Sequence, residues 1–201
     1  MQKNIMIIDE YQKRYLEHQK RKTESLKNDK GILPDTYTKK EAEIFFKILE
    51  GRHSQRTFNN EEVSEHELYQ IERATRTTPS SCDRRAVFTK PIIRREDKEM
   101  LSGLLVGGVG WAYRGQAILL LFADMNAYKN PVEQSYMPYL DAGVMIQTVY
   151  LAAEALNLGC CFVNPNVRVE NERFFKSRFD IDDNLLFCGA LVIGKYDIKY
   201  V

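Results

Sequence analysis

The sequence has few of the residues that build metal sites and disulfide frameworks. It contains four cysteines and three histidines among 201 residues, and no Cys-x-x-Cys pair. Neither a metal centre nor a disulfide scaffold is therefore expected. The adjacent Cys160 and Cys161 would point to opposite faces of a strand, which favours two buried thiols over a redox pair.

An excess of charge of one sign is lacking as well. The chain carries 29 basic and 28 acidic side chains, a net charge of +1. This balance gives no electrostatic case for nucleic acid or an anionic membrane as the main partner. Met1 to Asn4 do not open a long apolar segment, so no signal peptide is predicted and the cytoplasm is the expected compartment. A chain of this length can bury a sizeable core without cross-links.

The first forty residues differ in composition from the rest. Ile5 to about Asn28 contains neither Gly nor Pro and is dense in charged residues, which predicts a helix. One side of this helix carries Ile8, Tyr11, Tyr15 and Leu16. The stripe could pack on the body of the protein, reach across a dimer partner or, despite interleaved acids, contact nucleic acid. Lys30 to Asp35 is expected to end the helix. We therefore separate an N-terminal helical extension, residues 1–40, from a domain over residues 41–201.

The segment from Arg52 to Phe58 has the pattern of a clamp for a phosphate monoester. In an extended backbone, Arg52, Ser54 and Arg56 would point to the same side. Each guanidinium offers a fork of donors that matches two phosphate oxygens, and serine adds a third donor. The spacing alone is also common in solvated loops, so the prediction needs support from a second segment.

That second segment is the polar loop from Pro79 to Arg85. Between it and the clamp a helix is predicted from Ser64 to about Thr77, opened by a capping box with Glu67. This order could bring both ends of the helix near one ligand. Thr38 and Glu41 form the same capping pattern at the start of the helix that leads to the clamp.

Beyond residue 85 the pattern predicts strand, helix, strand, long helix, strand, helix and strand. Strands are expected at Val87–Ile93, at Ala117–Ala123, where a continuous apolar run indicates burial on both faces, and at Asp183–Gly194. A helix is expected at about Glu96–Leu105. The glycines at 107–110 favour a turn over a phosphate cradle, because their spacing is not that of the dinucleotide fingerprint. Mixed strands and helices of this kind indicate an α+β sheet protein.

The long helix, from about Met137 to Leu158, is apolar on most of its sides. Asp141, Gln147 and Glu154 interrupt it too often for a bilayer span. A chain of 201 residues seldom surrounds such a helix completely, so we predict that it lies at a subunit interface. Burial within the core of one chain is the alternative.

Together these motifs resemble the flavin-dependent nitroreductase family, whose members carry Arg-x-Ser-x-Arg/Lys-x-Phe and Pro-Ser-x-x-Asn-x-Gln-Pro-Trp. The run from Tyr139 to Gly143 is similar to the Asp-Ala-Gly start of a family helix, and Leu158-Gly159 to its Leu-Gly-Leu-Gly end. Leu191–Gly194 is similar to the final core strand. The resemblance covers roughly residues 41 to 195. It implies a central mixed, mostly antiparallel sheet flanked by helices, in an intertwined homodimer.

The resemblance also implies flavin mononucleotide (FMN) bound at the dimer interface. The clamp would hold the phosphate and ribityl end, and the serines of the polar loop would come from the other subunit. Main-chain groups at Asn164-Pro165 would lie beside the reactive edge of the flavin ring, and a late lysine, Lys195 or Lys199, would complete the phosphate site. The cofactor-binding residues so implied are Arg52, His53, Ser54, Arg56, Ser80, Ser81, Asp83, Arg85, Asn164, Pro165 and Lys195.

The polar loop departs from the family pattern. Asp83 stands where relatives usually have Asn, Arg85 where they have Gln, and Ala86-Val87 where they have Pro-Trp. Ionised Asp offers only acceptors to a flavin ring and disfavours its anionic reduced form. Arg84 or Arg85 could offset that charge. The redox potential and the substrate are therefore not expected to be ordinary for the family.

No general acid, base or nucleophile is identified, as expected where a flavin accepts the hydride and the protein positions it. The predicted function is an oxidoreductase that passes hydride from NAD(P)H to a small electron-poor acceptor, such as a nitroaromatic compound or a quinone. One alternative is a specialised biosynthetic flavoprotein that uses no free nicotinamide. Another is a dimer that has lost flavin and binds a different anion.

Overall fold

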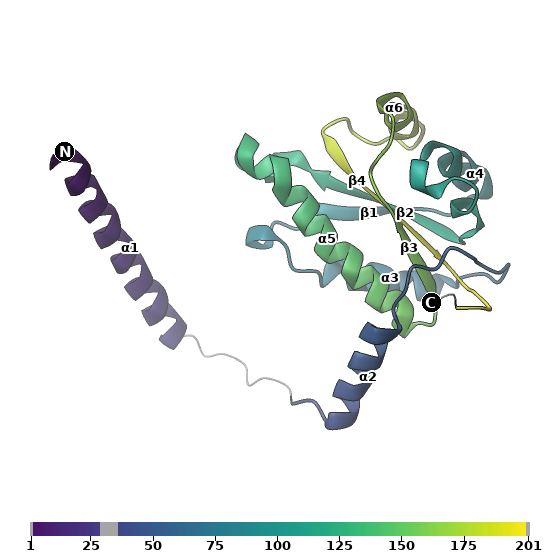
Figure 1. The fold of residues 1–201 in the computed structure, drawn as a ribbon, viewed down its shortest axis with the longest axis horizontal. Coiled ribbons are helices and arrows are strands. Elements are labelled where there is room, and N and C mark those ends of the chain that lie inside the picture. Colours follow the sequence, from purple (N-terminus) through teal and green to yellow (C-terminus); the bar gives the residue numbers. More distant parts are fainter. Residues whose placement is uncertain (1, 29–35, 200–201) are drawn as a thin grey trace. The chain divides into compact units, whose positions relative to one another are not determined.

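The computed structural model describes residues 2–28 and 36–199, with side chains from residue 10 onward except at 11, 26 and 28 (Figure 1). The chain divides into two compact units, Met1–Glu41 and Ala42–Val201. The expected end of the first helix, at residues 30–35, lies outside the described residues.

The first unit contains helix α1, Gln2–Asn28. The predicted helix is therefore present, with a start three residues earlier than expected. Tyr15 and Leu16, from the predicted apolar stripe, are exposed. The side chains of Ile8 and Tyr11 lie outside the described residues. What this stripe contacts stays a prediction.

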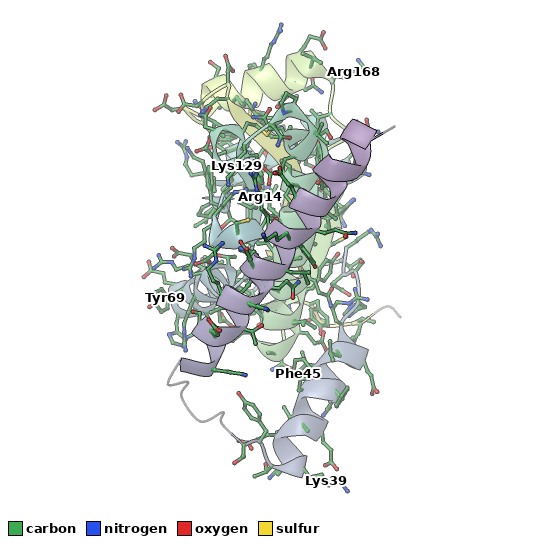
Figure 2. The ribbon with its side chains drawn as sticks, turned by 90° about the vertical axis from the view of Figure 1, so that its left-hand side faces the viewer. Arg14, Lys39, Phe45, Tyr69, Lys129 and Arg168 are labelled. Atoms are coloured by element: carbon green, nitrogen blue, oxygen red, sulfur yellow. The ribbon has the colours of Figure 1, made fainter. Side chains whose placement is uncertain are left out.

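Two helices flank the clamp segment, and both begin with the predicted caps. Helix α2, Lys39–Gly51, follows Thr38, whose hydroxyl accepts a hydrogen bond from the Glu41 N–H. Helix α3, Glu65–Arg76, follows Ser64, and here the complete capping box with Glu67 is formed. No residue of α2 is buried in the structure, including Phe45, which is labelled in Figure 2.

The second unit is built on a four-stranded sheet in the order β1-β2-β4-β3. All three pairings in the described part of the chain are antiparallel. The two central strands, β2 and β4, are buried along almost their whole length, as the apolar run in β2 predicts. The strands are β1 Val87–Ile92, β2 Ala117–Asp124, β3 Gly159–Val163 and β4 Leu185–Gly194.

Helices cover both faces of this sheet, which confirms the α+β class (Figure 1). On one face, α3 and α5 pack against strand residues such as Leu121 and Leu191. On the other, α4 and α6 pack against Leu120 and Phe122. Alternate residues of each strand thus serve two separate cores. The helices after β1 are α4 Arg95–Leu104, α5 Pro131–Ala155 and α6 Val169–Arg178, in the predicted order.

Helix α5 is longer than predicted. It begins at Pro131 rather than near Met137, because the Asn130 side chain accepts a hydrogen bond from the Glu133 N–H and proline suits the first helical turn. Pro138 lies inside the helix. The predicted turn at the Gly107–Gly110 run is present as a short 3-10 helix, Val106–Gly108, followed by turn residues.

One side of α5 is left uncovered by the other described residues of the second unit. Ala142, Val149 and Ala153 are buried against the sheet, whereas Leu140 and Val144 are 58% and 43% exposed. Within the second unit, the described residues therefore do not bury this helix completely. A row of apolar side chains on an exposed helix face is typical of an interaction surface.

Candidate functional site

The clamp segment runs from the end of α2 along β3. The Arg52 N–H donates to the Ile48 carbonyl, which continues the helix, and the Gln55 N–H donates to the Cys160 carbonyl on β3. Gln55 points inward and is fully buried, whereas Ser54 is half-buried and Arg56 is exposed. The alternation places the clamp side chains on the side opposite Gln55, as the sequence predicts.

Two clamp residues converge on Tyr150 of α5. The Ser54 and Tyr150 hydroxyl oxygens lie 3.1 Å apart, and the Arg52 guanidinium carbon lies 5.2 Å from the centre of the Tyr150 ring. The Phe162 N–H of β3 donates to the Tyr150 oxygen at 2.7 Å. Burial raises the pKa of Tyr150, so its hydroxyl stays protonated. Sequence reasoning missed this residue, because its helix position reads only as part of an apolar face.

The remaining clamp residue, Arg56, lies on the side of Cys161. Burial raises the pKa of the Cys161 thiol, while the charge of Arg56 and hydrogen bonding to Tyr150 and Ser54 act in the opposite direction. Cys161 is buried, as is Cys160, which belongs to the core formed with α5. The prediction of two buried thiols is confirmed. Both thiols stay protonated and do not act as nucleophiles at neutral pH.

Behind the clamp, His53 and Gln55 connect it to the end of the chain. His53 Nε2 lies 2.7 Å from Gln55 Oε1, and the Gln55 amide nitrogen donates to the carbonyls of Thr57 at 2.6 Å and Ile198 at 3.0 Å. These bonds leave the His53 side chain facing the C-terminal segment rather than the clamp. A contribution of His53 through its main chain fits this placement.

The two candidate lysines lie at opposite ends of the clamp. The Lys195 carbonyl accepts from the Asn59 N–H just after the clamp, and its ammonium is 3.7 Å from Glu67 of α3. The Lys199 ammonium is 2.8 Å from Glu154, and a Cβ added at Gly51 would lie 3.5 Å from it. Lys199 is thus the lysine beside the start of the clamp.

The polar loop is anchored by Asp141 of α5. One Asp141 oxygen accepts from the Ser81 N–H at 2.9 Å and from the Ser81 hydroxyl at 2.7 Å, and the other accepts from the Tyr128 hydroxyl at 3.1 Å. The Ser80 oxygen accepts from the Arg85 N–H at 2.9 Å. In the sequence, Asp141 stands out as a polar interruption of the helix and as the Asp of the Asp-Ala-Gly run. Asp141 and Ser81 are 60 residues apart, so no local sequence pattern indicates that they are hydrogen-bonded.

The same loop holds an unusual backbone. Cys82, Asp83 and Arg85 have φ angles of 53°, 53° and 52°, a left-handed conformation that costs non-glycine residues free energy and persists where surrounding contacts enforce it. The Arg84 guanidinium donates to Glu133 at 2.6 Å and supplies one such contact. The Asp83 carboxylate lies 3.0 Å from Arg85 Nε, and these side chains are 75% and 67% exposed. Asp83 is therefore already paired with a positive charge.

The clamp and the polar loop contact α5 at different points. Their anchors on α5, Asp141 and Tyr150, are nine residues apart, which corresponds to about 13 Å along a helix. Whether both segments reach one ligand, as the order clamp, α3 and polar loop suggests, stays a prediction. Helix α5 contacts both segments, and the spacing of Asp141 and Tyr150 along it sets the distance between these two contacts.

Asn164 and Pro165 follow directly after β3. The Asn164 side chain accepts from the Asn166 N–H at 3.1 Å, and both residues are at least partly exposed. Asn164 lies four residues along from Cys160, which pairs with the clamp, a distance of roughly 13 Å in a strand. A ligand with a phosphate at one end and a ring at the other could lie along β3. The guanidinium and hydroxyl donors of the clamp fit such a phosphate.

Residues 49–195 match the model of the nitroreductase family. The chain belongs to the nitroreductase family. The matched region contains the clamp, the polar loop, α5 and the whole sheet of this nitroreductase-family protein.

Individual relatives agree with this assignment. The chain is 31% identical over 127 residues to the FMN reductase [NAD(P)H] of Bacillus subtilis (strain 168), a match over 56% of this chain and 51% of that protein. It thus spans about half the length of that relative. The structure of the hypothetical oxidoreductase YcnD from Bacillus subtilis has 26% identity and a TM-score of 0.67, over 75% of this chain and 65% of that one. A putative nitroreductase from Desulfovibrio desulfuricans in complex with FMN has 21% identity and a TM-score of 0.65, over 83% and 94%.

The described residues contain neither a metal-binding cluster nor a membrane-spanning helix. No group of three or more histidine, cysteine, aspartate or glutamate side chains there could hold a metal ion. Among the helices that the structure describes, none has the length and apolar character needed to cross a bilayer.

Proposed function

We propose that this nitroreductase-family protein is an FMN-dependent oxidoreductase that passes hydride from NAD(P)H to a small electron-poor acceptor such as a nitroaromatic compound or a quinone. The observation that carries the proposal is the convergence of Arg52 and Ser54 on Tyr150 beside β3. It sets a guanidinium and a hydroxyl side by side as donors to a phosphate. The names of the related FMN reductase and of the FMN complex support the same cofactor.

The chain's own residues would hold the FMN along β3. Arg52, Ser54 and Arg56 would bind the phosphate, with Lys199 or Lys195 completing the charge. The main chain at Asn164-Pro165 would lie against the edge of the ring. When bound, the flavin supplies the hydride-accepting centre, and the protein contributes position and electrostatics.

A homodimer completes this site. The polar loop is bonded to Asp141 and the clamp to Tyr150, at separate points of α5. In such a dimer Ser80 and Ser81 of the partner subunit would approach the flavin. The uncovered apolar side of α5, which includes Leu140 and Val144, would form the interface. We infer that this dimer works in the cytoplasm.

The pairing of Asp83 with Arg85 bears on the alternatives. A bare carboxylate beside the ring would favour a protein that has lost its flavin, but here Arg85 lies 3.0 Å away and offsets part of its charge. The flavin-binding proposal is therefore preferred over another anion. A specialised biosynthetic flavoprotein would have the same clamp, and it differs in using no free NAD(P)H.

The proposal is tested with the purified protein. A flavin absorption spectrum, release of FMN on denaturation, and oxidation of NADH or NADPH in the presence of a quinone or nitroaromatic acceptor are expected. A flavin-loaded protein that oxidises neither nicotinamide would favour the biosynthetic alternative. A colourless protein with no affinity for added FMN would overturn the proposal.

A further inference from the structure

Tyr150 lies at the centre of a chain of three polar groups that ends at the clamp. The Phe162 N–H donates to the Tyr150 oxygen at 2.7 Å, and that oxygen is 3.1 Å from Ser54 Oγ. The phenol is more than nine-tenths buried, and the structure shows its hydroxyl among groups of β3 and the clamp. The proposed function uses Arg52 and Ser54 but assigns nothing to this tyrosine.

The bond from Phe162 has a fixed direction, whereas in the bond between Tyr150 and Ser54 either hydroxyl could donate. A main-chain N–H can only donate, so the Tyr150 oxygen accepts from Phe162 and retains its own proton for another acceptor. The neighbouring Cys161 sulfur is a weak acceptor, whereas Ser54 Oγ is a good one. A hydrogen bond from the Tyr150 hydroxyl to Ser54 Oγ is therefore stronger than one to the Cys161 sulfur. A serine that accepts from Tyr150 has its own proton free for a third group.

The aromatic ring of Tyr150 contacts another clamp residue, Arg52. The Arg52 guanidinium carbon lies 5.2 Å from the ring centre, within the range of a cation–π contact. Such a contact restricts the rotamers of a long side chain before the ligand arrives, which lowers the entropy lost on binding. One residue thus orients both a hydroxyl and a guanidinium.

We propose that Tyr150 is a positioning residue for phosphate recognition: its hydroxyl donates to Ser54, and this directs the Ser54 proton toward an oxygen of a bound phosphate monoester. The inference rests on the proposed function, because it assumes the clamp binds the phosphate of FMN. Tyr150 itself touches no ligand. Its effect should therefore depend on the phosphate and on Ser54.

The test compares FMN with riboflavin, which has the same ring and no phosphate. Binding of each to the apoprotein is measured by flavin fluorescence for the wild type, Tyr150→Phe, Ser54→Ala and the double variant. Tyr150→Phe keeps the ring over Arg52 and should weaken FMN binding by about threefold to tenfold, with riboflavin affinity unchanged. Ser54→Ala should weaken FMN binding by roughly tenfold or more. The double variant should bind FMN no more weakly than Ser54→Ala alone.

Tyr69→Phe is the matched control. It removes the same hydroxyl from a tyrosine of α3 that is 56% exposed and labelled in Figure 2, and neither flavin should bind differently. A purely structural role of Tyr150 would weaken FMN and riboflavin equally, or add to the effect of Ser54→Ala, and would overturn the inference. If Tyr150→Phe does not fold, Ser54→Ala still decides, because unchanged FMN affinity in that variant would show that Ser54 gives no proton to the phosphate.

Failure of the inference and failure of the proposed function give different results. A wild-type protein that binds riboflavin as tightly as FMN contradicts the phosphate clamp itself. A wild type that prefers FMN, with a Tyr150→Phe variant that does so to the same extent, contradicts only the role of Tyr150.

Discussion

At the scale of single residues, the clamp combines exposed charge with a buried support. Arg56 is exposed, whereas the partners that hold Arg52 and Ser54 are buried in the interface between α5 and β3. Exposed guanidiniums can meet a ligand, and buried partners keep their geometry constant. The residues that bind and the residues that position are therefore different, and substitutions should separate them.

The two arginines should contribute to FMN affinity through the phosphate. Each charge-assisted hydrogen bond should contribute roughly 1.5–3 kcal/mol. Arg52→Ala or Arg56→Ala should therefore weaken FMN binding by about tenfold to a hundredfold, measured by titration of the apoprotein. Arg95→Ala, which removes an exposed arginine paired with Glu99 on α4, serves as the control and should leave the affinity unchanged. Equal affinity of the wild type for FMN and riboflavin would rule out the clamp.

Asp83 and Arg85 should tune the flavin potential in opposite directions. If the Asp83 of the partner subunit lies about 5 Å from the ring, an effective dielectric near 20 gives a repulsion of roughly 3 kcal/mol on reduction. Its pairing with Arg85 offsets part of this. Asp83→Asn should then raise the midpoint potential by some tens of millivolts, since about 30 mV corresponds to 1.4 kcal/mol. Arg85→Gln should lower it. A redox titration that gives one potential for all three proteins would show a surface ion pair without effect on the ring.

At the scale of elements, caps and anchors place the two functional segments. Thr38 and Ser64 start the helices on either side of the clamp, and Asp141 and Tyr150 hold the polar loop and the clamp to one rigid helix. Local hydrogen bonds thus determine where each element starts. The long α5 determines how far apart the segments lie.

The capping box of α3 should have a measurable effect on stability. Ser64→Ala removes the acceptor of the Glu67 N–H and should lower the free energy of unfolding by about 1 kcal/mol. Ser135→Ala, at an exposed helical serine that bonds only the Val132 carbonyl among the contacts the structure describes, should cost less. Thermal or urea unfolding of both variants measures this. An equal loss of stability in the two would contradict the cap.

The charge on Glu67 makes this contribution pH-dependent. The hydrogen bond from Ser64 lowers the pKa of Glu67 below its usual value, and the charge of Lys195 acts in the same direction. A carboxyl whose folded pKa is depressed stabilises the protein above its unfolded pKa, and this stabilisation is lost as the pH falls through the folded pKa. The difference in unfolding free energy between wild type and Glu67→Gln should therefore be largest above about pH 5 and shrink below about pH 4. A difference that grows on acidification would contradict the assignment.

At the scale of the whole molecule, the α+β unit presents one apolar face that its own described residues leave uncovered. Two helices cover each face of the sheet, yet the outer side of α5 keeps large apolar side chains exposed. The polar loop is bonded to Glu133 and Asp141 of this helix, and the clamp contacts Tyr150 nearer its C-terminal end. A second copy that covers α5 would bury the apolar side and join the clamp of one subunit to the polar loop of the other.

The dimer should depend on the exposed side of α5. Val144→Glu should weaken association and FMN binding together, because a charge in an obligate interface is buried without a partner. Val169→Glu, at a 59% exposed valine on α6, is the matched control and should do neither. Val149 is unsuitable for this test, because it is fully buried within its own chain and its substitution would unfold the protein. Light scattering and flavin content measure the outcome. A stable, flavin-loaded monomer would contradict the architecture.

The sequence by itself determined the local structure and the family resemblance. The caps at Thr38 and Ser64, the buried strand at Ala117–Ala123 and the spacing of the clamp all depend on residues within a few positions of one another, so pattern alone predicted them. The start of α5 was predicted too late, because the residues between Asn130 and Met137 show little apolar periodicity. The helix start there depends on one side chain, Asn130, which caps it. Only the tertiary structure decided which polar groups meet. Ser54 and Tyr150 are 96 residues apart, and Ser81 and Asp141 are 60 apart. The partner of a hydroxyl or a carboxylate depends on how a helix packs across a sheet, and no short stretch of sequence carries that information.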